Sequence, residues 1–277
     1  MITTNFKLGT LAMALAGFAL VTTPAAAEES TGDQWTFALT PYLWLPNING
    51  SLKYDLPNFD TNPEVETGPN DYLSNLDMAF MINGEARKGK WSIFTDFIYL
   101  DFGSEDSHVK SFGGTNINAT IDLGTKSSLS GDLWTLVGGY ALVQDPGATL
   151  DVIGGFRYLG IEAKTDWSLS ATINDPNSGE TLAASGSISQ DANLWDGIVG
   201  VRGHVRLGKS NWSIPYYADV GAGDSDLTWQ AMAGLAYNWS WGDVVVAYRY
   251  LSYDMADDKL LQDVSFGGPA LGVTFRW

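Results

Sequence analysis

The stretch WQAMAGLAYNW, which runs from Trp229 to Trp239, alternates between two sets of side chains. One set comprises Trp229, Ala231, Ala233, Leu235, Tyr237 and Trp239, and the opposite set includes Gln230, Met232, Gly234 and Asn238. Successive side chains of a β-strand point to opposite faces, so the stretch predicts a strand with one apolar face. Ten residues at about 3.3 Å each, tilted by about 45°, cover roughly 23 Å, which matches the apolar band of a membrane-spanning barrel. We therefore predict a strand that crosses a lipid bilayer with a Trp at each end.

The same alternation recurs along the chain and predicts further strands. It is clear in segments 35–45, 76–85, 150–158, 195–207 and 271–277, and weaker in segments 91–102 and 133–143. Short Gly-containing connections lie at 86–90, 144–148, 208–211 and 240–243, and longer polar stretches lie near 47–75, 103–130, 164–192, 221–226 and 254–263. Short turns that alternate with long loops are typical of bacterial outer-membrane barrels.

The four short connections and five long loops would join ten strands. We therefore predict an all-β fold, a transmembrane, antiparallel, up-and-down β-barrel of about ten strands. Eight or twelve strands are the alternatives, because residues 51–56, or the long segments near 117–130 and 164–190, would change the number if they paired separately. The first long loop is expected to include a short helix near residues 71–76.

The positions of the Trp residues independently support a membrane girdle at both ends of the strands. Six lie beside a short turn or the chain end, namely Trp35, Trp91, Trp212, Trp239, Trp241 and Trp277, and all of these except Trp241 are girdle candidates. Four lie at the opposite ends of their strands, namely Trp44, Trp134, Trp195 and Trp229. Aromatic side chains collect at membrane interfaces in this way, whereas the aromatic residues of a soluble β-sandwich core need not. We therefore predict that these nine residues form the girdle.

Composition excludes several classes of protein. The chain has 277 residues, 17% of them charged, with a net charge of −17 and no Cys. Binding of nucleic acid requires clustered Lys and Arg, so a nucleic-acid partner is not expected. Without Cys there is no disulfide framework, thiolate metal site or Cys nucleophile. We also expect no cofactor.

Both ends of the sequence carry targeting features. Lys7, a short apolar run and the AAA sequence that ends at Ala27 predict a cleaved signal peptide over 1–27, which leaves 28–277 as one barrel domain. At the other end, Gly272, Phe275 and Trp277 follow a spaced pattern that resembles the signal read by the barrel assembly machinery. We expect that machinery to be a partner through Phe275 and Trp277.

Several short motifs resemble those of small porin-like barrels from proteobacterial outer membranes. They lie at 40–45, 75–80, 84–91, 97–101, 155–159, 229–231 and 248–254, so the resemblance covers nearly the whole mature chain. It implies a fold, an outer-membrane location in a Gram-negative bacterium, and contact with outer-membrane lipids and lipopolysaccharide. It implies no particular activity.

The alternation also assigns charged residues to the interior of the barrel. Lipid-facing Arg or Lys at the bilayer midplane costs roughly 2–4 kcal/mol, so charges in the strands are expected to face inward. The candidate lumen-lining residues are Asp77, Glu85, Asp96, Arg157, Asp196, Arg202, Asp219 and Arg249. Arg87, Lys88 and Lys90 are instead expected in a periplasmic turn, where they either contact anionic headgroups or form a simple polar turn.

Two functions are compatible with such a narrow polar lumen. Paired acids and Arg residues would fill a small barrel and give it a structural or envelope role. Alternatively, they would line a constricted pore for small solutes. A hydrolase sited in a loop is less favoured, because the chain has only His108 and His204 to serve as a base. No catalytic residue and no metal site is predicted.

Overall fold

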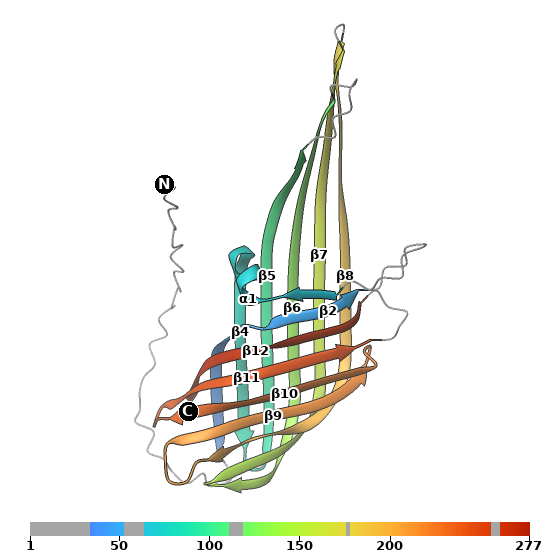
Figure 1. The fold of residues 1–277 in the computed structure, drawn as a ribbon. Helices are drawn as coiled ribbons and strands as arrows, with labels where there is room; N and C mark the ends of the chain where they lie inside the picture. The colour runs from blue at the N-terminus through green and yellow to red at the C-terminus, as the bar shows by residue number, and fades with distance from the viewer. Residues whose placement is uncertain (1–33, 53–63, 111–118, 176–177, 256–260) are drawn as a thin grey trace, which may run out of the picture.

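Ten antiparallel strands close into a barrel, as the alternation predicted (Figure 1). The computed structural model describes residues 34–52, 64–110, 119–175, 178–255 and 261–277, so the predicted signal peptide lies outside the described residues. The barrel strands are β1 (Trp35–Trp44), β4 (Leu76–Lys88), β5 (Trp91–Lys110), β6 (Ala119–Asp145), β7 (Ala148–Asp175), β8 (Ser178–Arg206), β9 (Trp212–Gly223), β10 (Leu227–Asn238), β11 (Gly242–Asp254) and β12 (Leu261–Arg276). Each pairs with its neighbours in this order, and β1 also pairs with β12, which completes the wall.

The first long loop adds two further strands to the sheet without entering the closed ring. β2 (Asn47–Leu52) pairs with β12 in the register set by β1, because Trp44 lies opposite Ala270 and Asn47 lies opposite Gly267. β3 (Glu64–Thr67) then pairs with β2. These two strands lie above β12 and cross in front of β5 to β8 in Figure 1. The sheet therefore contains twelve strands, of which ten form the barrel.

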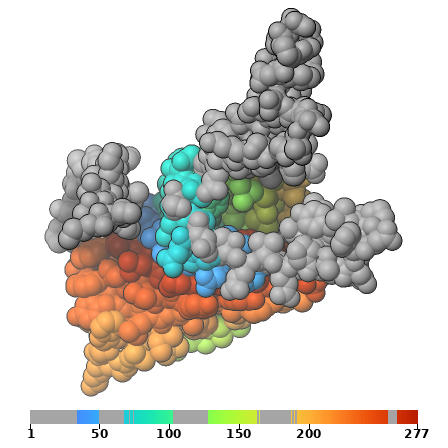
Figure 2. All heavy atoms as spheres, turned by 45° about the horizontal axis from the view of Figure 1, so that its top comes forward, coloured from blue at the N-terminus to red at the C-terminus, as the bar shows by residue number. Residues whose placement is uncertain are grey.

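Two short helical segments follow β3 and lead into β4. They are α1 (Pro69–Tyr72) and the 3₁₀ helix η1 (Leu73–Asn75), so the helix expected near residues 71–76 is present and begins slightly earlier. The cyan surface in Figure 2, next to the blue surface of the first strands, includes described residues of these segments together with β4 and β5. No helix in the described part of the chain is long and apolar enough to cross a membrane.

Four strands extend well beyond the height of a bilayer. β5 to β8 contain 20, 27, 28 and 29 residues, whereas about ten residues span the apolar band. Figure 1 shows β6, β7 and β8 rising far above the other strands. Much of the sequence predicted as loop at 103–130 and 164–192 is therefore strand. The prediction failed there because apolar alternation marks strands with one buried or lipid-facing side, and these segments project outside the membrane.

The exterior of the barrel is apolar and carries most of the predicted girdle. Seven of the nine predicted girdle residues are exposed, namely Trp35, Trp91, Trp195, Trp212, Trp229, Trp239 and Trp277, and Trp241 is exposed as well. Trp134 is half-buried and packs edge-on against Phe156, with ring centroids 5.1 Å apart. Closure of the sheet pairs most backbone groups of the strands with one another, and an apolar exterior suits lipid. The protein is thus an integral outer-membrane β-barrel.

Trp44 differs from its predicted girdle position. Its side chain is only 4% exposed and belongs to a cluster inside the barrel. Trp35 and Trp44 are nine positions apart in one strand, and an odd separation places two side chains on opposite faces. Because Trp35 faces outward, Trp44 must face inward.

Candidate functional site: the barrel lumen

The register of the strands arranges the inward-facing residues in rows. Residues that lie opposite one another on neighbouring strands share a face, so a row of register partners runs around the lumen. One such row, from β1 to β8, comprises Thr40, Asn83, Asp96, Thr135, Arg157 and Asp196. Residues that lie far apart in the sequence are thereby brought to one level of the interior.

The outer part of the lumen is filled by apolar side chains. The next row toward the external loops comprises Met81, Ile98, Leu133, Leu159 and Leu194. It packs with Trp44, Leu251, Tyr253, Met255 and Val264, and every member of this apolar cluster is at most 8% exposed. The expectation of a polar lumen is therefore wrong for this part, because apolar residues occupy both faces of the strands there, as in the pairs Leu133-Trp134 and Leu194-Trp195.

Next to the apolar cluster, two buried ion pairs cross the lumen. Arg157 of β7 pairs with Asp219 of β9, both side chains are 0% exposed, and Arg157 also donates a 3.1 Å hydrogen bond to Thr228. Arg249 of β11 pairs with Asp96 of β5 at 2.7 Å. These pairs join strands that are not neighbours: β8 lies between β7 and β9, and β12, β1 and β4 lie between β11 and β5.

Additional contacts fix the Arg249 guanidinium. Its nitrogen atoms donate to the Tyr42 hydroxyl at 3.1 Å and to the Gln230 side-chain oxygen at 2.8 Å. The same guanidinium lies over the ring of Trp44, 4.6 Å from the centroid. A planar guanidinium with hydrogen-bonded edges and an aromatic ring on its face is held in a single orientation.

Asp196 has a different role from the paired acids. Its Oδ1 accepts hydrogen bonds from the backbone nitrogen of Ser225 at 3.0 Å and from the Ser225 hydroxyl at 2.8 Å. It therefore fastens the short β9–β10 connection to β8.

The prediction that Asp77 lines the lumen is wrong. Asp77 is exposed at a register irregularity between Leu76 and Met78, where the strict alternation of faces is interrupted.

The periplasmic part of the lumen contains ion pairs that are less buried. Glu85 accepts from Arg87 at 2.9 Å and from Arg202 at 2.6 Å, and Arg87 also pairs with Asp151. Arg202 lies over the Phe94 ring, 4.2 Å from the centroid. The Arg87 side chain thus belongs to this network rather than to the turn surface, because it follows Glu85 by two positions and shares its face.

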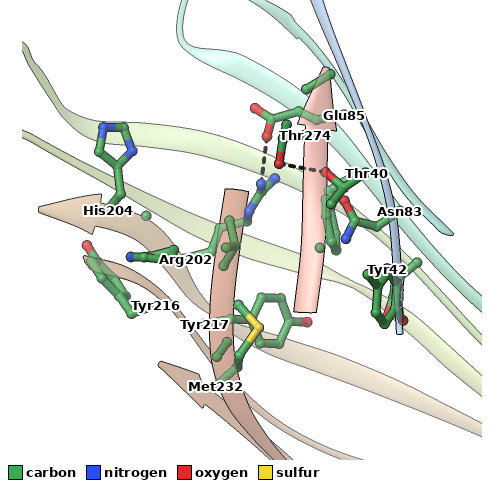
Figure 3. A pocket seen from close by; sticks show the side chains of 18 of the residues that line it. Thr40, Tyr42, Asn83, Glu85, Arg202, His204, Tyr216, Tyr217, Met232 and Thr274 are labelled. Carbon is green, nitrogen blue, oxygen red and sulfur yellow. Dashed lines mark hydrogen bonds and ion pairs between the residues drawn. The ribbon is translucent and has the colours of Figure 1, made fainter. Parts of the chain in front are cut away.

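A cavity of about 250 Å³ occupies this periplasmic part. Figure 3 shows Thr40, Tyr42 and Asn83 on one side of it, His204 and Tyr216 on the other, and the Arg202–Glu85 pair between them. At the periplasmic end Arg276 pairs with Asp243 at 2.7 Å, and half of the Arg276 side chain is exposed. The cavity therefore reaches the periplasmic end, whereas the apolar cluster lies at the other.

His204 is the histidine whose side chain the structure describes. Its Nδ1 lies 3.0 Å from the Thr149 hydroxyl. His108 belongs to β5, and its side chain lies outside those that the structure describes. Among the described residues, no cluster of three His, Asp or Glu side chains is placed to hold a metal ion.

Comparison with known proteins adds similarity of fold only. No family model matches the sequence, and no curated relative matches it. Among solved structures, outer membrane protease OmpT from Escherichia coli has a TM-score of 0.49 and 9% identity over 89% of this chain and 98% of that chain. The translocator domain of autotransporter NalP from Neisseria meningitidis has a TM-score of 0.36 and 14% identity over 90% of each chain. Ail from Yersinia pestis has a TM-score of 0.29 and 12% identity over 88% of this chain and 99% of that chain.

Proposed function

We propose that this protein is a non-conducting outer-membrane barrel with a structural role in the envelope. The observation that carries the proposal is the Arg157–Asp219 pair, whose two side chains are completely inaccessible to water in the middle of the barrel. A pore needs a continuous water path, and ion selectivity requires charged side chains that face this path. Buried charges that are paired and hydrogen-bonded instead hold the strands of the barrel wall together.

The apolar cluster supports the same conclusion at the outer end. Tyr253 and Leu251 are each 1% exposed, and Trp44 is 4% exposed, although all three side chains point into a barrel. Side chains packed this closely exclude water, and apolar constrictions resist the entry of hydrated ions. The cavity at the periplasmic end is then a blind recess rather than part of a channel.

The projecting strands suggest what such a barrel supports. Strands β5 to β8 share one continuous ladder from the membrane region to their outer ends, apart from one irregularity between Phe102 and Glu105. A barrel made rigid by its interior ion pairs would anchor the projecting part of β5 to β8 at the cell surface. We propose accordingly that the protein contributes envelope integrity or surface contacts, with outer-membrane lipids and lipopolysaccharide around it, after assembly that uses Phe275 and Trp277.

Conductance in planar lipid bilayers tests the proposal. The purified protein should give no current steps above the lipid baseline. The Trp44→Ala/Leu251→Ala variant should conduct, because it removes two large side chains from the apolar cluster. Its matched control, Leu43→Ala/Leu271→Ala, alters two exposed residues of the lipid-facing surface and should stay silent. Reproducible steps from the unaltered protein would show that it is a passive pore, which is the alternative function.

A further inference from the structure

The barrel wall is interrupted between β1 and β4 in its outer half. The pairing of these strands ends at Pro41 and Ile82. Beyond that point, residues 76–81 of β4 pair with β5 alone among the described strands, and β12 continues its pairing with β2 instead. We call the interrupted stretch, between residues 42–44 of β1 and 76–81 of β4, the seam.

Hydrogen bonding at the seam departs from that of a regular sheet. The N–H groups of Phe37 and Leu45 bond to β12, so the even-numbered residues of β1 direct theirs toward β4. The N–H of Trp44 donates to the Met81 sulfur at 3.1 Å. The next even-numbered residue is Pro46, which has no N–H to donate. A thioether is a weak acceptor, so this part of the wall is held by side-chain contacts rather than by a backbone ladder.

Most side chains on the two sides of the seam are apolar, the exceptions being Tyr42 and the exposed Asp77. On the lipid-facing side, Leu43, Met78 and Phe80 are 45%, 53% and 44% exposed. On the interior side, Trp44 and Met81 belong to the apolar cluster. A route between Leu43 and Phe80 would therefore pass apolar side chains, in contrast to entry through the periplasmic end of the lumen, where ion pairs are partly exposed.

One residue of α1 links the two sides of the seam at its outer end. The Tyr72 hydroxyl donates to the Pro46 carbonyl at 2.8 Å, and its ring packs edge-on against Phe102 of β5, with centroids 5.7 Å apart. Burial raises the pKa of Tyr72 to about 12, so the hydroxyl remains a donor at neutral pH. A side-chain hydrogen bond of this kind is much weaker than a ladder of backbone bonds.

We propose that the seam admits one acyl chain from the outer leaflet into the apolar cluster. An acyl chain is the occupant because Leu43 and Phe80 are exposed on the apolar surface that faces the bilayer, and because an acyl chain matches the apolar character of the cluster behind them. The unbranched side chain of Met81 can repack around such a guest. This inference goes beyond a structural role, yet it is consistent with a lumen closed to ions, since an apolar guest opens no water path.

Photolabelling inside a membrane tests the proposal. The full protein is reconstituted in phosphatidylcholine vesicles that contain a long-chain fatty acid with a diazirine near its terminal methyl, and adducts are located by mass spectrometry after irradiation. Interior residues such as Met81, Ile98 and Leu133 should carry adducts in addition to the lipid-facing Leu43 and Phe80. Adducts confined to lipid-facing residues would overturn the proposal.

Bridged variants test the route of entry. The chain has no Cys, so only introduced thiols react with a short bifunctional thiol reagent. A Leu43→Cys/Phe80→Cys bridge spans the seam, whereas the matched Leu39→Cys/Gly84→Cys bridge joins the same strands where they already pair. The first bridge should lower interior labelling at least fivefold and the second should leave it unchanged. Equal interior labelling in both variants would overturn the seam as the route. Neither result depends on bilayer conductance, so this proposal and the proposed function can fail independently.

Discussion

The two parts of the lumen are built by the same strands but differ in how they are filled. The dry part comprises the apolar cluster and the Arg157–Asp219 pair, whereas the hollow part is the periplasmic cavity with its partly exposed ion pairs. Both lie behind a lipid-facing exterior of the same apolar character. Lipid therefore constrains one face of each strand and leaves the other face free to differ along its length.

Side-chain size accounts for much of the difference. The dry part contains Leu, Ile, Met, Trp and Tyr at successive register positions. The wall of the cavity includes small residues, namely Ala38, Gly203, Ala247, Ala270 and Gly272. In a barrel of fixed strand number, bulky residues meet across the axis while small ones leave space. Water can then reach the charges in the hollow part, which weakens the ion pairs there.

Removal of Arg157 should produce the largest effect. Arg157→Ala leaves Asp219 as a fully buried, unpaired carboxylate, which should destabilise the protein by about 3–5 kcal/mol. Urea unfolding of the protein in lipid vesicles, followed by Trp fluorescence, measures this loss. The Arg157→Ala/Asp219→Ala variant is the control and should lose less than the sum of the single changes. A loss below about 1 kcal/mol for Arg157→Ala would show that this level of the lumen is hydrated.

Leu251→Ala should have the next largest effect. Leu251 is 1% exposed within the dry part, so truncation leaves a cavity and should cost about 2–5 kcal/mol in the same unfolding assay. Leu271→Ala is the matched change on the outer surface, where the side chain is 53% exposed. It should cost no more than about 1 kcal/mol, because lipid takes the place of the lost atoms. Equal losses for the two variants would contradict the distinction between a packed interior and a lipid-facing exterior.

Glu85→Gln should have the smallest effect. Glu85 and Arg202 are 20% and 17% exposed in the hollow part, so water screens their attraction. Loss of the charge should cost at most about 1 kcal/mol. Added salt should narrow the difference from the unaltered protein, since screening of accessible charges increases with ionic strength. A loss as large as that of Arg157→Ala, independent of salt, would place this pair in a dry environment.

The strands that cross the membrane were predictable because lipid imposes a strict alternation. The same rule indicates which way a side chain points, but it cannot identify the partner. Arg157 meets Asp219 across the lumen, from strands that are separated by β8. Such a pairing depends on the number of strands and their stagger, and no local pattern contains that information.

The errors of prediction share a physical cause. Trp44 was assigned by its position near a strand end, although its odd separation from Trp35 already placed it on the inner face. The outer segments of β5 to β8 lie beyond the lipid, so neither face of these strands needs to be apolar. Asp77 lies at an irregularity that interrupts the alternation. At each of these positions, contact with lipid does not decide which way the side chain points or where the strand ends.

Closure of the wall by β1 and β12 has a consequence for the order of folding. Most neighbouring strands are joined by short turns and can pair as soon as both are available. The closing contact instead joins Thr40 to Thr274, which are 234 positions apart. Bringing such distant segments together carries a large loop-closure entropy, and contacts of this range slow folding. The ring of backbone hydrogen bonds is thus completed only when β12 is available to pair with β1.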